Sequence, residues 1–390
     1  MRLRVAERLR NWRAWQRAKG RAEFAFYHAS VAALQPLNLV LSILLRHRVR
    51  PRSVLHLSGM IHVPWQTTRL LRQQGWHADY IAIGKSPIWD LADFCREEKR
   101  PGLDAFNEFW WFWRVMARYS IVHLHFMKTL SRTGWELYWL KRMGCKIVVH
   151  WRGCEIRDRE RNMALHPDIN LCQECDYKPP ACKLEVNEQR RRLARRFGDA
   201  SLVTTPDMLD FVPDATYLPF FAPDQAPAPR RRDPGEAFRL VHVTVHQGLE
   251  GTRQIREVVE RLQRKGYRIN FRALAWIKPH EVLQAFAEAD MAIGKMKMGH
   301  YANAQIESMT MGVPTITFVR QEFMTDDLRR SGFIFATLKN LEEVLEHYLS
   351  HPDELAAKRA IARASILRLH DNQAIAARLS RMYDTLLAAR

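Results

Sequence analysis

Glycine and proline are scarce and scattered in this sequence, which holds 17 glycines and 18 prolines among its 390 residues. Their scarcity excludes collagen-like and low-complexity chains. Disorder is excluded as well, because 47% of the residues are hydrophobic and only 26% are charged. A globular chain of this length is too long for one ordinary core and suits two α/β domains with additions.

Acidic residues are also in short supply, since 61 Lys and Arg stand against 42 Asp and Glu and give a formal charge of +19. Such a surplus attracts phosphates, nucleic acid or anionic lipid. Solvated helix faces, such as the arginines at 190–192, account for part of it. We find no recognisable RNA or DNA motif, so the expected partner is an anionic membrane surface and not nucleic acid.

A secretory signal is missing too, because the first residues hold no short apolar region followed by a small-residue cleavage site. We therefore expect a cytoplasmic, reducing compartment. Basic residues between Arg2 and Arg21 are interleaved with Leu, Val and Trp, a mixture that is typical of a helix lying on an anionic membrane.

The apolar run from Phe24 to Leu45 raises the question of a membrane span. Residues near its middle argue against a full span: His28, Gln35, Pro36 and Asn38. Three alternatives stay open, namely a helix packed on the first domain, a helix on the membrane surface, and a span. Basic residues at both flanks favour the surface, so we expect a peripheral protein on the inner face of the cell membrane.

Four of the six cysteines gather in one stretch of the chain: Cys154, Cys172, Cys175 and Cys182. Four thiolates suit tetrahedral zinc, and the spacing of the C-x2-C pair is favourable. Structural zinc, free thiols and a disulfide remain as alternatives. A zinc ion there would tie down a loop and would take no part in catalysis.

Short apolar strands alternate with helical stretches from Ser53 onward, as in a parallel sheet with crossover helices. A turn at Ser58-Gly59-Met60 leads from the first strand into a helix over 66–74. The aromatic run WWFW at 110–113 lies on a predicted helix and serves either core packing or an acceptor-binding surface. The predicted strands of this series are 54–57, 80–83, 121–125, 146–150 and 202–205.

A second α/β series follows a linker rich in proline and arginine. Its predicted strands are 240–243, 269–271, 291–293 and 315–318, with a helix over 252–265. Two Rossmann-like lobes are therefore expected. The expected segments are a basic and apolar helical extension over 1–50, a first lobe over 51–222, a linker over 223–235, a second lobe over 236–365 and a C-terminal helix over 366–390.

Three motifs follow one another in the second lobe. They are HQGLEGT at 246–252, AEADMAI at 287–293 and GHYANAQIESMTMGVP at 299–314. In this order they resemble the donor-binding lobe of retaining glycosyltransferases with the GT-B fold (glycosyltransferase group 1, family 4-like). Weaker likenesses in the first lobe lie at 150–155 (HWRGCE) and 205–221.

The resemblance implies where a nucleoside-diphosphate sugar binds. The carboxylate of Glu307 accepts hydrogen bonds from the ribose hydroxyls, and amides at a helix N-terminus near Gly248 hold the diphosphate. His150 or Glu155 orients the sugar or the acceptor hydroxyl. The expected catalytic residues are His150, Glu155 and His246, and the expected donor-binding residues are Gly59, Gly248, Lys295, Lys297, Gly299, Tyr301, Asn303 and Glu307.

The chain departs from the family in two places. Gly299 stands where many members carry a first glutamate, and the usual Arg and Lys of the diphosphate loop are His246 and Glu250 here. A carboxylate beside a diphosphate is repulsive. We expect the missing positive charge from neighbouring side chains, for which the candidates are Lys295, Lys297, Arg253 and His246.

The expected function is sugar transfer from a nucleoside-diphosphate sugar to a lipid-linked or cell-surface glycan acceptor, as in polysaccharide or lipopolysaccharide biosynthesis. The resemblance implies retention and no cofactor for catalysis, so stabilisation of the departing phosphates is the main catalytic task. Two alternatives keep the fold. One is a non-catalytic GT-B scaffold that partners another glycosyltransferase, and the other is a sugar-nucleotide epimerase or hydrolase.

Overall fold

The chain forms two compact units, Met1–Val149 with Leu193–Ala200 and Met382–Arg390, and His150–Arg192 with Ser201–Arg381. The computed structural model describes residues 2–99, 101–177, 182–223, 233 and 235–389, and for residues 2–19, 101 and 102 it describes the backbone alone. Most of the expected linker over 223–235 therefore lies outside the described residues, and the expected segment bounds stay predictions.

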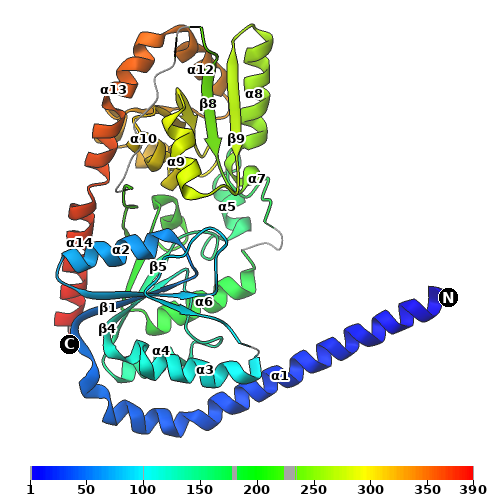
Figure 1. Cartoon of the computed structure of the whole chain (residues 1–390), viewed down its shortest axis with the longest axis vertical. Coiled ribbons are helices and arrows are strands. Elements are labelled where there is room, and N and C mark those ends of the chain that lie inside the picture. Colours follow the sequence, from blue (N-terminus) through cyan, green and yellow to red (C-terminus); the bar gives the residue numbers. More distant parts are fainter. Residues whose placement is uncertain (1, 100, 178–181, 224–232, 234, 390) are drawn as a thin grey trace. The chain divides into compact units, whose positions relative to one another are not determined.

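The first sheet has the strand order β3-β2-β1-β4-β5-β6-β7. Figure 1 labels β1, β4 and β5 of this sheet. The interior strand β1 pairs in parallel with both β2 and β4. Because the chain leaves β1 toward one edge and returns through β4 toward the other, the carboxyl ends of β1 and β4 form a topological switch point. The strands are β1 (Arg50–Ser58), β2 (His77–Ile83), β3 (Phe94–Arg96), β4 (Tyr119–His125), β5 (Lys146–Trp151), β6 (Ala200–Val203) and β7 (Thr216–Tyr217).

Apolar runs account for this sheet, since every residue of β4 is buried, as parallel strands covered on both faces require. Gly59 follows β1, and its carbonyl accepts a hydrogen bond from the Tyr80 hydroxyl. The accompanying helices are α1 (Arg2–Leu44), α2 (His62–Gln73), α3 (Pro101–Arg114), α4 (Trp135–Arg142), α5 (Arg159–Leu165) and α6 (Leu184–Phe197), with short 3-10 helices at Arg46–Arg48, Met116–Arg118 and Pro206–Asp210.

The second sheet has the order β12-β11-β10-β8-β9, and all its neighbours pair in parallel. Helix α8 packs on this sheet through Ile255, Val258, Val259 and Leu262, which are buried. Their spacing of three and four residues places them on one face of the helix. The elements are β8 (Phe238–Val243), α7 (Gln247–Glu250), α8 (Thr252–Arg264), β9 (Ile269–Leu274), α9 (Pro279–Ala287), β10 (Met291–Ile293), α10 (Asn303–Thr310), β11 (Thr315–Thr317), a 3-10 turn (Gln321–Phe323), α11 (Asp326–Arg329), β12 (Phe333–Phe335), α12 (Leu341–Ser350), α13 (Pro352–Leu369) and α14 (Asn372–Ala388).

The two Rossmann-like α/β series predicted from the sequence are confirmed by these two sheets. Each predicted strand coincides with an observed one, and the strand predicted over 291–293 matches β10 at both ends. Three strands were not predicted, namely β3, β7 and β12. Each is only two or three residues long, so no hydrophobic period can develop within it.

Helix α1 has an unusual distribution of side chains. Several of its polar residues face the protein, where Tyr27, Asn38 and Ser42 are almost fully buried, whereas His28 is exposed. The indole of Trp113 on α3 donates to the Asn38 side chain at 2.7 Å. Side chains of the opposite face are apolar and exposed: Phe24, Phe26, Leu37, Leu39, Val40, Ile43 and Leu44. Packing on the first unit is thus confirmed for one face only.

The segment Gly20–Leu44 of α1 is the one candidate membrane span in the described part of the chain, judged by length and composition. Such a test is also passed by core helices and signal sequences, so it leaves the three alternatives for this segment open. The basic side chains expected to face lipid between residues 2 and 19 lie outside the described side chains.

Candidate functional site

The loop after β8 carries the first sequence motif and leads into two successive helices. His246 precedes α7, and Gly251, with φ of 87°, joins α7 to α8. His242 of β8 anchors the loop, because its ring nitrogens bond to the Ile293 carbonyl at 2.8 Å and the Thr252 hydroxyl at 2.9 Å. The loop and the start of α8 are therefore held against the end of β10.

Glu174 forms the central contact of this region. Its carboxylate is bound by the Lys297 ammonium, the Arg253 guanidinium and, at 2.7 Å, the Gln254 amide. These hydrogen bonds lower the pKa of Glu174 to about 2. The bond from Lys297 contributes most, followed by those from Gln254 and Arg253. A carboxylate therefore occupies a cluster of cationic and polar donors at the N-terminal turn of α8.

The backbone of Gly248 contacts the segment that carries Glu174. Its N–H donates to the Asp176 carboxylate at 3.2 Å. A Cβ at Gly248 would lie 1.9 Å from the Glu174 carbonyl oxygen, so only glycine fits. The His246 ring packs on Tyr177 with centroids 3.8 Å apart, and burial lowers the pKa of His246. Residues 174–177 thus cover the predicted diphosphate loop.

Lys295 forms an ion pair with Glu250. This contact answers the repulsion expected from the sequence, because the ammonium neutralises the carboxylate that stands where the family has a cation. It also means that Lys295 is engaged. Of the predicted positive groups, Lys297 and Arg253 bind the carboxylate of Glu174, whereas Lys295 pairs with Glu250 of α7.

Glu307 lies on α10 and is mostly buried. Burial raises the pKa of its carboxyl to about 7. Among the residues that the structure describes, no side-chain hydrogen bond or ion pair involves this carboxyl. A buried acid without partners is costly, and such groups concentrate at functional sites.

Gly299 adopts φ of 82°, and a Cβ there would lie 2.6 Å from the Arg320 side chain. Arg320 in turn binds Asp210 at 2.7 Å and contacts His166. A glutamate at 299 is therefore incompatible with this arrangement. Sequence reasoning missed Arg320, because its partners are separated from it by more than one hundred residues.

The residues after Gly299 turn back into the core. Tyr301 packs with Phe333 in a buried cluster, and its hydroxyl lies 3.0 Å from His370 Nε2. Burial lowers the pKa of His300 to about 4. Asn303 begins α10 and is partly exposed. The side chain of Tyr301 therefore has a packing role, and a ligand would meet the backbone of this segment.

His150 is the penultimate residue of β5, where its ring lies 3.3 Å from both the Arg152 guanidinium and the Thr204 hydroxyl. Glu155 accepts a hydrogen bond from the Arg152 amide at 2.5 Å, and burial raises the pKa of Glu155. Both side chains stabilise the turn after β5. Their expected role toward an acceptor stays a prediction.

The four cysteines of the segment 154–182 form no disulfide. Burial raises the pKa of Cys154 to about 11, and the thiols of Cys172 and Cys182 add to the rise. Burial also raises the pKa values of Cys172 and Cys182, each with a contribution from Cys175. Asn162 donates to the Cys172 sulfur at 3.3 Å. No three of these thiols lie close enough together in the described part of the chain to form a metal-binding group, so the predicted zinc site stays a prediction.

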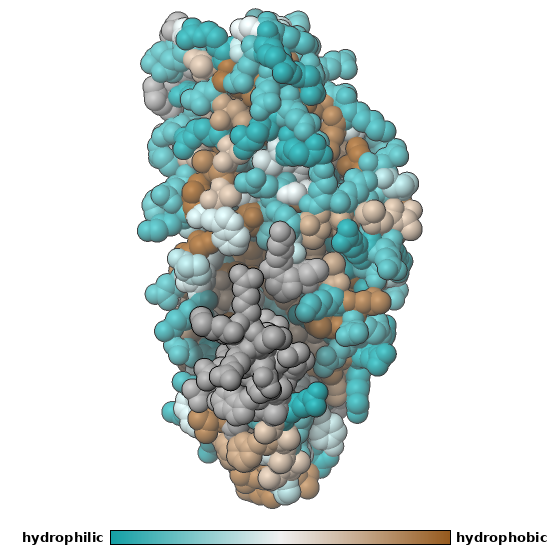
Figure 2. All heavy atoms as spheres, turned by 90° about the vertical axis from the view of Figure 1, so that its right-hand side faces the viewer, coloured by the Kyte–Doolittle hydropathy of each residue, from teal (hydrophilic) through white to brown (hydrophobic). Residues whose placement is uncertain are grey.

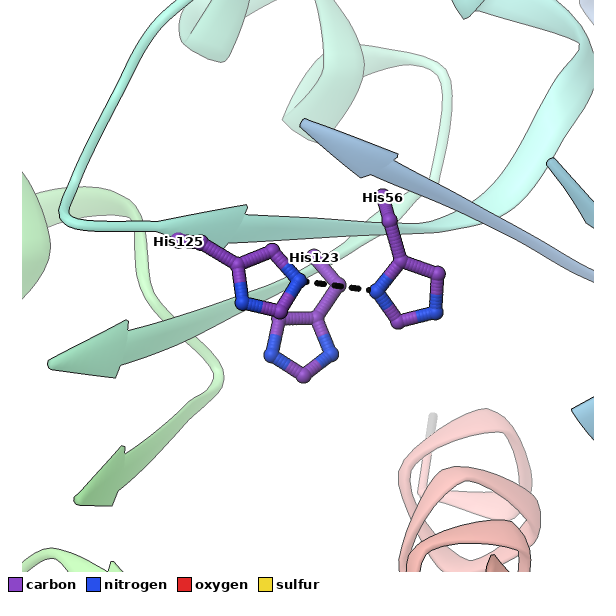
Figure 3. A group of neighbouring side chains, drawn as sticks. All are labelled: His56, His123 and His125. Carbon is purple, nitrogen blue, oxygen red and sulfur yellow. Dashed lines mark hydrogen bonds between the residues drawn. The ribbon is translucent and has the colours of Figure 1, made fainter. Parts of the chain in front are cut away.

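A second group of potential metal ligands was not predicted (Figure 3). His56 of β1 stands opposite His123 of β4, and His125 lies two residues further on the same face. All three are fully buried, with donor atoms within 4.8 Å of one another. His56 Nδ1 lies 3.0 Å from His125 Nε2, and the Tyr383 hydroxyl bonds to His123. A metal ion would replace the hydrogen bond between His56 and His125.

The chain is similar to known proteins in fold but not in sequence. No protein-family model and no curated protein sequence matches this chain. Sucrose-phosphate synthase from Thermosynechococcus elongatus is 14% identical, with a TM-score of 0.58 over 87% of this chain and 100% of that chain. The catalytic domain of starch synthase IV from Arabidopsis thaliana, bound to ADP and acarbose, is 10% identical, with a TM-score of 0.58 over 87% and 99%. The chain therefore has the GT-B glycosyltransferase fold that its motifs predict.

Proposed function

We propose that this chain is a glycosyltransferase that moves a sugar from a nucleoside-diphosphate sugar to a lipid-linked or cell-surface glycan acceptor, with retention. Two proteins of the same fold are named sucrose-phosphate synthase and starch synthase, and the second holds ADP and acarbose. The observation that carries the proposal is the anion-binding group at the start of α8, formed by Lys297, Arg253 and the Gly248 amide.

In this proposal the donor diphosphate takes the place of the carboxylates of Glu174 and Asp176. Phosphate oxygens accept the same charge-assisted bonds from an ammonium, a guanidinium and a backbone amide. The dipole of α8 favours negative charge at this end. Donor binding therefore displaces the 174–177 segment, and the energy needed for this displacement lowers donor affinity.

The reaction breaks the bond between the anomeric carbon and the diphosphate oxygen, which keeps the electron pair. A bond from the acceptor oxygen to the anomeric carbon forms, and the acceptor hydroxyl gives its proton to the departing diphosphate oxygen. Lys297 and Arg253 stabilise the departing phosphates, and His246, whose pKa is lowered by burial, acts as a neutral ring beside them. His150 and Glu155 orient the sugar or the acceptor hydroxyl. No cofactor enters the scheme.

Glu307 is proposed to bind the nucleoside. Its carboxylate has no side-chain partner in the described chain, so two ribose hydroxyls would supply the hydrogen bonds that it lacks. Bonds to the ionised form would lower its pKa again. Gly59, Gly299, Tyr301 and Asn303 would contribute backbone contacts to the donor.

The proposed location of the protein is the inner face of the cell membrane, where its partner is an anionic lipid surface and not nucleic acid. The support is the reversed polarity of α1: Tyr27 and Asn38 are buried, while Phe26 and Ile43 are 55% and 65% exposed. Apolar side chains gather where α1 and α3 lie, at the lower end of Figure 2. A lipid-linked acceptor would be met at such a surface.

We also propose that Cys154, Cys172, Cys175 and Cys182 hold a structural zinc ion. Zinc prefers four thiolates in tetrahedral geometry, and its charge would lower the thiol pKa values that burial now raises. The same loop carries Glu174. Zinc would therefore raise the free energy needed to displace the segment that covers the anion-binding group.

A specific observation favours the scaffold alternative as well. Glu174 and Asp176 fill the anion-binding group, and Arg320 fills the space beside Gly299. A protein that no longer binds a donor would keep such contacts. An epimerase or hydrolase on this fold would bind the donor but need no acceptor.

Calorimetry of the full chain with a panel of nucleoside diphosphates and their sugars, with and without magnesium, tests the proposal. Selective binding to one base supports a donor-dependent enzyme. No binding across the panel, with folding confirmed by circular dichroism, would favour the scaffold. Donor breakdown at the same rate with and without glycan acceptors would favour the hydrolase or epimerase.

A further inference from the structure

A pocket of about 380 Å³ opens at the edge of the first sheet where β1, β2 and β4 begin. Ligands of open parallel sheets bind at the opposite edge, at the carboxyl ends of the strands. This pocket therefore lies apart from the edge expected for the reaction. Three arginines, two tryptophans and a tyrosine are among its lining residues: Arg50, Arg114, Arg118, Trp110, Trp111 and Tyr119.

The pocket carries uncompensated positive charge. Burial lowers the pKa of Arg118, and the charges of Arg114, Arg50 and Arg48 lower it further. No carboxylate of the described residues forms an ion pair with Arg114 or Arg118.

Asp79 is the acidic residue of the lining, and its carboxylate is already engaged. It accepts a hydrogen bond from the Tyr119 hydroxyl at 2.5 Å and pairs with Arg72 at 2.9 Å. It is therefore not available to neutralise the arginines. An anion from outside the chain would remove their repulsion.

The pocket adjoins an apolar surface through Trp110, which lines it and is 54% exposed. Phe106 and Leu103 precede Trp110 by one and two turns of α3, respectively, and are also more than half exposed. Helix α3 packs beside α1, whose outward side chains are apolar. Tryptophan is enriched at the headgroup level of membranes.

We propose that this pocket binds the phosphate group of an anionic membrane lipid while the outer face of α1 and α3 lies on the membrane. The planar forks of Arg114 and Arg118 suit phosphate oxygens. Nucleic acid would use the same charge but would gain nothing from the adjoining apolar face. The inference rests on the membrane attachment in the proposed function and adds a defined headgroup site to it.

Flotation of the full chain with phosphatidylcholine vesicles, with and without phosphatidylglycerol, tests the site. The double variant Arg114→Gln/Arg118→Gln is compared with Arg264→Gln/Arg268→Gln, which removes the same charge from an exposed part of the second unit. We expect about 10- to 30-fold weaker binding to anionic vesicles for the first and less than 3-fold for the second. Circular dichroism confirms that each variant is folded.

The variant Arg114→Lys/Arg118→Lys separates a phosphate pocket from diffuse charge. Lysine keeps the charge but loses the fork, so we expect several-fold weaker binding. Full retention by the lysine variant, or equal losses in the two glutamine variants, would overturn the pocket while leaving membrane attachment in place. Failure of the unmodified chain to bind either vesicle would overturn both, as would binding to an RNA oligonucleotide in their place.

Discussion

The carboxylate of Glu174 is bound by the ammonium of Lys297, although the two residues are 123 positions apart. Lys297 is almost fully buried, and its ammonium also donates to the Gly248 carbonyl at 3.2 Å. An internal anion therefore holds the donors that a diphosphate would use. This contact makes donor binding a competition between the ligand and the 174–177 segment.

Replacing Glu174 by glutamine is expected to strengthen binding of the matching nucleoside diphosphate about 3- to 10-fold, because the competing charge is lost. Glu257→Gln is the matched control, since Glu257 also pairs with Arg253 but lies on α8 itself. Calorimetry measures both. Equal or weaker binding by the Glu174 variant would show that the segment does not compete with the ligand.

Nucleotide binding is expected to weaken as the pH falls through about 7, because the free carboxyl of Glu307 titrates near that value. Only the ionised form accepts hydrogen bonds from both ribose hydroxyls. Glu307→Gln should lower affinity about tenfold at pH 8 and flatten this part of the pH profile. Glu343→Gln, an exposed control on α12, should retain the wild-type profile.

The same pKa shift predicts a change in stability. Because the folded pKa of Glu307 lies above its ordinary value of 4.5, its proton stabilises the fold fully below pH 4.5, and this contribution is lost as the pH rises through about 7. The difference in the free energy of unfolding between Glu307→Gln and wild type should therefore depend on pH. It should favour the variant at pH 8 by up to about 3 kcal/mol more than at pH 4. Urea unfolding at both pH values measures it, and an equal effect at both would contradict the burial of this carboxyl.

Gly299→Ala should destabilise the protein more than Gly266→Ala. Both glycines have positive φ, but a Cβ at 299 meets the Arg320 side chain at 2.6 Å, whereas a Cβ at 266 meets nothing within 4 Å. We expect a loss of about 1 kcal/mol at 266 from backbone strain and about 2 to 3 kcal/mol at 299. Equal losses in urea unfolding would mean that Arg320 moves aside freely.

Strands were predictable where apolar runs are long, as in β1 and β4, and the motif from Gly299 to Pro314 indicated the fold. The contacts of the site were not predictable. Nothing near Glu174 in the sequence points to Lys297, and the pairing of His56 with His123 depends on which strands become neighbours. The exposed apolar face of α1 was likewise hidden, because its buried polar residues looked like interruptions of a span.

Tyr383→Phe tests the buried histidine cluster. The substitution removes the hydroxyl that bonds to His123 and leaves a buried ring nitrogen without that bond, at an expected cost of about 1 to 3 kcal/mol. Tyr348→Phe, in a partly exposed position on α12, should change stability by less than about 0.5 kcal/mol. Thermal unfolding compares them, and identical midpoints would argue that the bond contributes nothing.

Metal analysis of protein purified under reducing, chelator-free conditions should find about one zinc ion per chain. Cys172→Ser/Cys175→Ser should lose it, whereas Cys95→Ser, at an exposed thiol outside the loop, should keep it. Zinc that survives the double substitution but is lost with His125→Ala would place the metal in the histidine cluster instead. Absence of zinc from the unmodified chain would refute the structural site.

The most direct test of sugar transfer is release of nucleoside diphosphate by the full chain, followed with a panel of nucleotide sugars and a membrane lipid extract as the source of acceptor. We predict that one donor is consumed, that its consumption requires the extract, and that the sugar appears in the lipid or glycan fraction. Folded chain that binds no nucleotide and consumes no donor under these conditions would contradict the proposed function.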